Sequence, residues 1–160
     1  MKRSLWICVM ALLSLQLPAA SRNAVAVEPV KAEIPAGNGA ITIKITGLRS
    51  ASGNLLVALF NAKKGFPGKF ENAVRQASVT AAGSDHVAVF SDVPFGTYAV
   101  AVRHDENGNG KLDANFLGMP KEGVGVSNNP KSKFGPPSFD AASFTLDKKA
   151  LELNVNLRYL

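Results

Sequence analysis

The residues best suited to chemistry lie in one short run, residues 104–113, which is rich in acids, amides and glycines. Oxygen ligands for Ca²⁺ in the helix-loop-helix calcium motif come from loop positions one, three, five, seven and nine, and a glycine at position six makes the sharp turn. If Asp105 is position one, Gly110 falls at position six. The oxygen positions are then Asp105, Asn107, Asn109, the carbonyl of Lys111 and Asp113. This spacing predicts a cation-binding loop with Ca²⁺ as the ion.

The run lacks the last ligand of that motif. Position twelve is Phe116, where the motif has a bidentate glutamate. A bound ion would need a donor from elsewhere, and the nearby candidates are Glu122, Asn115, Asp140 and Asn128. We include Glu122 in the expected ligand set. Because the loop itself carries only two ligand carboxylates, we expect weak affinity, on the order of 10⁻⁴ to 10⁻³ M, as in extracellular calcium modules.

A metal-free interpretation of the same run stays open. Asp and Asn side chains bond to nearby backbone amides, and glycine adopts positive φ, so tight turns are built from these residues with no ion. The five matches to the calcium register and the glycine at position six exceed what a turn needs. We therefore favour the metal loop and keep the Asx-rich turn as its alternative.

An enzyme is the less favoured hypothesis. His104 stands beside Asp105, with Glu122 and Ser127 downstream, which is compatible with acid-base or nucleophilic chemistry. No sharp nucleophile turn surrounds a serine, and the two histidines lack metal-ligand spacing. We expect His104 to be a structural side chain at the end of a strand, hydrogen-bonded to the cation loop, and the protein to be non-catalytic.

Residues 1–26 have the pattern of a secretory signal peptide. A basic start precedes an apolar run at residues 5–17, and small residues follow it. Ala24 and Ala26 favour cleavage after Ala26, although cleavage after Ala20 also fits. The run is too short to span a bilayer. We expect export to the periplasm or beyond, and no transmembrane segment after cleavage.

The charge left after cleavage argues against a nucleic-acid partner. The whole chain carries +6, but the leader holds three basic residues and no acid, which leaves 15 basic and 12 acidic residues, or +3. The remaining lysines are scattered and are not interleaved with aromatics, as a nucleic-acid surface would require. The one cysteine, Cys8, lies in the leader, so no disulfide is available to the mature chain.

The elements that must position the loop are short strands. Residues 27–38 contain two prolines and are expected to form an extended tether, and residues 39–160 a single domain. Alternating or continuous apolar runs predict strands at residues 41–48, 55–60, 74–80, 86–90, 97–103, 143–146 and 151–159. Residues 97–103 place Tyr98, Val100 and Val102 on the inward face and lead directly into the cation loop.

Three further features complete the expected architecture. Phe66 and Phe70 are expected to plug one end of the core. Residues 114–141 show no clear period and are expected to be a long functional loop. Residues 143–146 and 151–159 look like a hairpin. About seven strands without an amphipathic helix predict an all-β antiparallel sandwich, of the transthyretin-like or carboxypeptidase-regulatory-like type, which the Pro94-x-Gly96-x-Tyr98 turn resembles.

Several clustered motifs resemble a bacterial family. These are the run at residues 104–113, Gly118-Met-Pro-Lys-Glu-Gly123, Ser127-Asn-Asn129 and Gly135-Pro-Pro-Ser-Phe139. Together they resemble the exported proteins grouped as domain of unknown function family 2141, over residues 41–159. The resemblance implies a signal-bearing β protein and implies no activity.

The sequence therefore predicts an exported, non-catalytic β-sandwich whose calcium-binding-like loop orders a surface for a ligand or partner. That partner would be a glycan, a peptide or another envelope component. A hydrolase using His104 and Glu122 is one alternative, and a purely structural envelope protein is another.

Overall fold

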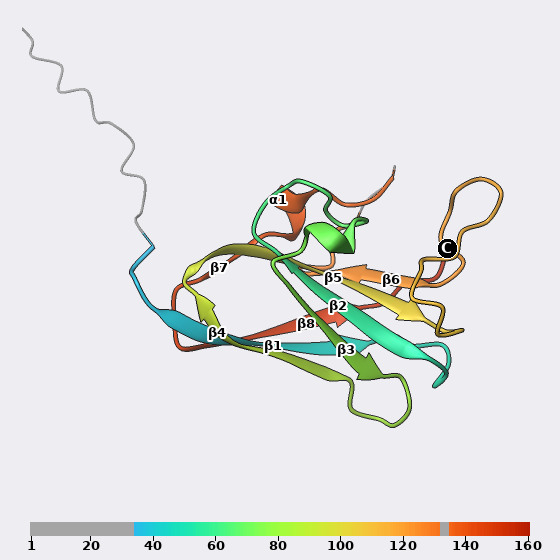
Figure 1. The fold of residues 1–160 in the computed structure, drawn as a ribbon, viewed down its shortest axis with the longest axis horizontal. Coiled ribbons are helices and arrows are strands. Elements are labelled where there is room, and N and C mark those ends of the chain that lie inside the picture. Colours follow the sequence, from blue (N-terminus) through green and yellow to red (C-terminus); the bar gives the residue numbers. More distant parts are fainter. Residues whose placement is uncertain (1–33, 132–134) are drawn as a thin grey trace, which may run out of the picture. The chain divides into compact units, whose positions relative to one another are not determined.

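Two packed β-sheets make up the fold in the computed structural model, which describes residues 34–131 and 135–160 (Figure 1). The expected signal peptide and residues 27–33 of the expected tether lie outside the described residues. No helix among the described residues is long and apolar enough to cross a membrane.

Among the described residues, eight strands form these sheets, and two short helical turns lie in the connections. The strands are β1 (Asn38–Thr46), β2 (Asn54–Phe60), β3 (Arg75–Thr80), β4 (Val87–Pro94), β5 (Gly96–Asp105), β6 (Gly123–Val126), β7 (Phe144–Leu146) and β8 (Ala150–Asn156). The helical turns are the 3₁₀ turn η1 (Phe70–Asn72) and α1 (Phe139–Ala142). The predicted all-β sandwich is confirmed.

The first sheet has the order β4-β1-β8, and the second has the order β3-β2-β5-β6, with β7 paired to the start of β5. Most neighbours are antiparallel, but β8 runs parallel to β1 over the whole length of β8. At the far end of β8 the chain changes sheets, because Leu157 still bonds to Thr46 whereas Arg158 pairs with Val124 of β6.

The main core lies between the two sheets. Alternate residues of β1 and β5 point into it, among them Ile41, Ile43, Val100 and Val102, each at most 1 % exposed. In β4 the buried residues are Ala88, Phe90 and Val93, so the face shared by Val87 and Val89 is the exposed one. Strands β2 and β5 are nearly continuous apolar runs because both of their faces are covered.

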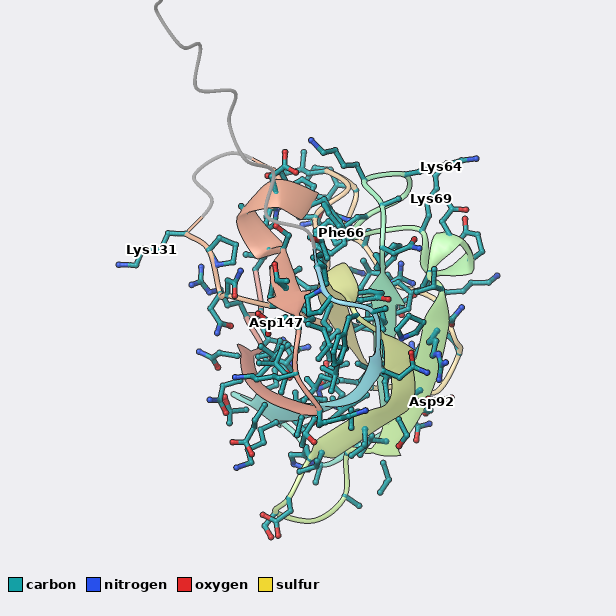
Figure 2. All side chains as sticks on the ribbon, turned by 90° about the vertical axis from the view of Figure 1, so that its left-hand side faces the viewer. Lys64, Phe66, Lys69, Asp92, Lys131 and Asp147 are labelled. Carbon is teal, nitrogen blue, oxygen red and sulfur yellow. The ribbon has the colours of Figure 1, made fainter. Side chains whose placement is uncertain are left out.

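A second apolar cluster covers the outer face of the five-stranded sheet. Phe60 of β2 meets Phe66 and Phe70 edge-to-face at ring-centroid distances of 5.3 and 6.3 Å, and Phe66 meets Phe139 at 5.7 Å. Phe66 lies among the side chains beside α1, whereas Lys64 and Lys69 of the same segment project outward (Figure 2). The phenylalanines are structural, but they cover the face of a sheet and do not close an end of the sandwich.

Two expectations about the second half of the chain are wrong. The segments 143–146 and 151–159 do not form a hairpin, because β7 pairs with β5 in one sheet and β8 pairs with β1 in the other. The long segment 114–141 is not all loop, because it contains β6 and α1. Strand β6 reads Gly-Val-Gly-Val, and its glycines hide it because glycine is depleted in strands.

Candidate functional site

Strand β5 carries the chain into the predicted cation loop and buries the loop's first residue. Asp105 is the last residue of β5, is 3 % exposed, and lies opposite Asn54 of β2. Gly53 has φ +75 and packs directly on the Asp105 carbonyl, so no larger residue fits there. The backbone position of Asp105 is therefore set by the sheet.

The loop folds around this carboxylate through its own backbone. One Asp105 oxygen accepts from the Asn109 N–H at 3.1 Å and the other from the Gly110 N–H at 2.7 Å. The Oδ1 of Asn107 accepts from the Asn109 N–H, and that of Asn109 accepts from the Lys111 N–H. Gly108 and Gly110 both have φ +72, the left-handed region that glycine tolerates.

Asp113 closes the loop from its far end. The side-chain amide of Asn107 donates to one Asp113 oxygen at 2.7 Å, and that of Asn109 donates to the other at 3.2 Å. The predicted side-chain ligands Asp105, Asn107, Asn109 and Asp113 are thus linked by hydrogen bonds within one turn of chain. Lys111, predicted to offer its carbonyl, is exposed.

Glu122 is the one candidate for the last ligand that braces both ends of the loop. It is 4 % exposed, and its two oxygens accept from the Glu106 N–H at 3.0 Å and from the Asp113 N–H at 3.1 Å. The other candidates bond elsewhere. Asn115 holds the next turn through the Leu117 and Met119 amides, Asp140 pairs with Lys63, and Asn128 bonds to Ser143.

The donors at this loop are oxygens of mixed type. Among the described residues, no group of three or more His, Cys, Asp or Glu side chains is placed to hold a metal ion. Any ion held here would depend on Asn and backbone oxygens as well as carboxylates. Such a donor set suits a hard cation with many ligands, such as Ca²⁺, better than Zn²⁺.

An ion pair neutralises the carboxylate that points away from the loop. Arg49, in the turn after β1, bonds to both oxygens of Glu106, and the Ser50 hydroxyl donates to it at 2.8 Å. The Arg49 hydrogen bond holds the pKa of Glu106 below its ordinary value, against the opposing effect of burial. Arg49 also donates to the Lys121 carbonyl, so it ties this turn to the segment before β6.

The residues considered for catalysis have structural partners. His104 is fully buried, and its ring nitrogens contact the Tyr159 hydroxyl at 2.7 Å and the Ser52 carbonyl at 2.8 Å. Ser127 is fully buried and donates to the Ala142 carbonyl at 2.6 Å. Glu122 is engaged by the two loop amides described above. His104 bonds to the turn before β2 and to the end of the chain, not to the cation loop.

The chain matches a family of known bacterial proteins. The family described as "Uncharacterized protein conserved in bacteria (DUF2141)" matches residues 43–154, which is most of the chain. The chain belongs to this family. No curated protein and no solved structure matches it.

Beside the loop, this DUF2141 member has a cavity of about 540 Å³ that the sequence did not reveal. Its floor is the outer face of β5 and β6, and one wall is the chain that leaves the cation loop, including Leu112, Met119 and Pro120. Strand β6 forms half of this floor, so the failure to predict β6 concealed the cavity as well.

The tip of that wall presents apolar side chains to solvent. Phe116 is 95 % exposed and Leu117 is 68 % exposed, so neither belongs to the core. The Asn115 side chain fixes the tip, and Ala114 pairs with Pro120 across its base. Phe116, at the position where the helix-loop-helix motif has its last ligand, therefore points away from the domain in the DUF2141 chain.

Proposed function

We propose that this protein is an exported, non-catalytic binding protein whose Asx-rich loop holds Ca²⁺ and thereby orders one wall of the adjacent cavity. The observation that carries the proposal is that four predicted oxygen ligands meet on one loop, and that the same loop leads straight into the cavity wall. The ligand would be an envelope component, a glycan or a peptide, or a small molecule from the same compartment.

The chemistry of the loop supports a weak, exchangeable calcium site. Each side-chain oxygen of Asp105 and Asp113 accepts one N–H, and a carboxylate oxygen has room for a second partner. Asn107 and Asn109 are exposed, so an ion could enter and leave without opening the domain. The carboxylates supply two charges, or three if Glu122 takes part, which agrees with affinity in the range on the order of 10⁻⁴ to 10⁻³ M.

An ordered loop would also order the cavity wall, because both ends of the wall are tied to the loop. The wall begins at Leu112 and ends before Glu122, and the Lys121 N–H donates to the Asp113 carbonyl at 2.8 Å. An ion that fixes Asp113 against Asp105 would therefore also fix Leu112 and Pro120 over β5. The expected result is a better ordered cavity when calcium is bound.

A thermal melt with and without Ca²⁺ tests the proposal. A ligand that binds only the folded state raises the melting temperature, so calcium is expected to raise that of the parent. Asp105→Asn keeps the size of the side chain and removes its charge, and this variant is expected to lose the calcium response. Asp147→Asn removes a carboxylate from the turn between β7 and β8 (Figure 2) and should respond like the parent.

The alternatives give different results in this experiment. A metal-free Asx turn predicts no calcium response in any variant, and that result would refute the ion site. A calcium response that Asp105→Asn retains would place the ion elsewhere. A purely structural envelope protein predicts that no small ligand binds the cavity in either condition.

A further inference from the structure

The floor of the cavity carries two arginines in one lateral row of the sheet. Arg103 of β5 is paired with Val124 of β6, and Val124 is paired in turn with Arg158. Residues directly opposite one another on neighbouring strands point to the same face. The two arginines therefore flank Val124 on the outer face, about 10 Å apart at the backbone by two strand spacings, and all three residues line the cavity.

Neither guanidinium is paired with a carboxylate. Arg103 donates to the Gly68 carbonyl and lies over the Phe70 ring at 3.9 Å, and among the described residues neither it nor Arg158 forms a salt bridge. Arg49, Lys44 and Lys63, in contrast, each pair with an acid. A guanidinium fork presents several N–H donors in a geometry that matches carboxylate and phosphate oxygens.

Burial makes the charged form of Arg103 less favourable, and a nearby anion would offset this effect. Burial lowers the pKa of its guanidinium, although the charges of Glu71 and Glu122 act in the opposite direction. Neither glutamate lines the cavity, and no Asp or Glu does so among the described residues. The charged side chains that line the cavity among the described residues, Arg103 and Arg158, are therefore both cationic.

The rest of the cavity is mostly apolar, and its other polar residues are Asn129 and Asn156. Ala101 and Val126 continue the floor, and Met119, Pro120, Pro130 and Pro137 belong to the walls. A volume of about 540 Å³ falls within the range of pockets for small molecules. Such a pocket suits a molecule with an apolar body and one charged end.

We propose that the cavity binds an amphipathic anion, with a carboxylate or phosphate head above Val124 between Arg103 and Arg158 and an apolar body against the Met119 and proline walls. The inference deepens the proposed function, on which it rests for treating this cavity as the ligand site. It names the class of that ligand.

Calorimetric titration with four ten-carbon probes tests the proposal. Decanoate and decyl phosphate carry the two possible heads, decanol has none, and decyltrimethylammonium has the opposite charge. At least one of the two anions is expected to bind at one site per chain, and decanol and the cation much more weakly. The tighter of the two anions identifies the head. Decanol binding as tightly as both anions, or no binding by either anion, would overturn the proposal.

Substitutions then locate the site. Arg158→Gln removes an exposed guanidinium, so folding should be preserved, and anion binding should weaken by about tenfold or more because a charge-assisted hydrogen bond is lost. Arg75→Gln is the matched control, since Arg75 bonds to Ser91 and Asp92 outside the cavity. Val124→Phe fills the space between the arginines and should also abolish binding. Equal affinities of Arg158→Gln and Arg75→Gln would refute the assignment, as would full binding by Val124→Phe.

Each titration is run in EDTA and in Ca²⁺, so that the calcium site and the anion site are tested independently. Arginine-dependent binding in both conditions, without any calcium effect on melting, supports the anion site and refutes the ion site. A calcium-dependent melting shift without binding of either anion refutes the anion site and leaves the ion site standing.

Discussion

At the scale of single residues, a hydrogen-bond network around the buried His104 fixes the end of β5. The Ser52 carbonyl can only accept a hydrogen bond, so His104 Nε2 donates to it, and Nδ1 lies 2.7 Å from the Tyr159 hydroxyl. That hydroxyl in turn accepts from the Arg49 N–H at 3.2 Å. The Tyr159 ring lies where a Cβ on Gly123 would be, at 2.7 Å, so the start of β6 requires glycine.

The ion pair between Arg49 and Glu106 predicts a pH dependence with a definite sign. The pKa of Glu106 is lowered in the folded protein from its ordinary value of 4.5, chiefly by the Arg49 hydrogen bond. Its charge therefore stabilises the fold above pH 4.5, and this contribution is lost as pH falls below 4.5 through the lower folded pKa. Denaturant unfolding should show the parent more stable than Glu106→Gln at neutral pH, with a smaller difference in acid.

Arg49→Gln supplies the control for this prediction. If the pair is the cause, adding Glu106→Gln to Arg49→Gln should change stability less than it does in the parent, because contacting partners are not additive. A stability difference between the parent and Glu106→Gln that is the same at neutral and acid pH would contradict the assignment.

The sequence predicted individual site residues better than it predicted their partners. The register from Asp105 to Asp113 depends on local spacing, and the structure brings these side chains together. The ligand set included Glu122, but the sequence could not show which of the four further candidates lies at the loop, because distances between loops depend on the fold. These candidates were Glu122, Asn115, Asp140 and Asn128. For the same reason the contact of His104 with Tyr159, 55 residues away, was not predictable.

At the scale of elements, strand signals were clear where side chains alternate and absent where glycines replace them. Strands β1, β2 and β5 were expected close to their observed bounds, whereas β6 was not expected at all. Gly123 and Gly125 in β6 have no side chain because Tyr159 and Val155 occupy that space. The hairpin was predicted wrongly for another reason. A short turn between two apolar runs does not reveal that the two strands belong to different sheets.

Glu122 is the residue through which the start of β6 holds the loop, and amide exchange tests this role. Glu122→Ala leaves the Glu106 and Asp113 N–H groups without their acceptor, which costs about 1 to 3 kcal/mol for a buried group. Both amides are expected to exchange faster with solvent in NMR measurements. Glu122→Gln keeps one acceptor oxygen and should have a smaller effect.

An amide far from the loop gives the internal control. The Val100 N–H bonds to the buried Ser127 hydroxyl, and its protection should be the same in the parent and in both variants. Unchanged exchange at Glu106 and Asp113 in Glu122→Ala would show that the loop closes without this carboxylate.

At the scale of the whole molecule, most residues that stabilise the main core of the described domain are different from those of the proposed site. The main core lies between the sheets, and a second cluster covers part of the outer face of the five-stranded sheet. The cavity lies on the adjoining part of that outer face and shares Ala101 and Val126 with the second cluster, and the cation loop extends from the end of β5. Residues of the cation loop and the cavity walls can therefore change without disturbing the main core.

This separation predicts that core and loop substitutions have different effects. Leu55 of β2 is fully buried in the main core, and Leu55→Ala should lower the free energy of unfolding by about 2 to 5 kcal/mol through lost burial and a cavity. Its melting temperature should nevertheless still rise with Ca²⁺, because Asp105 is held by the sheet edge and by loop amides. Asp105→Asn should show no calcium response, and it should lose about 1 to 3 kcal/mol of stability because the Asn nitrogen cannot accept from a loop amide as the carboxylate oxygen does. If Leu55→Ala also abolished the calcium response, the loop would depend on the packing of the whole sandwich. Core stability and calcium binding would then not be separable.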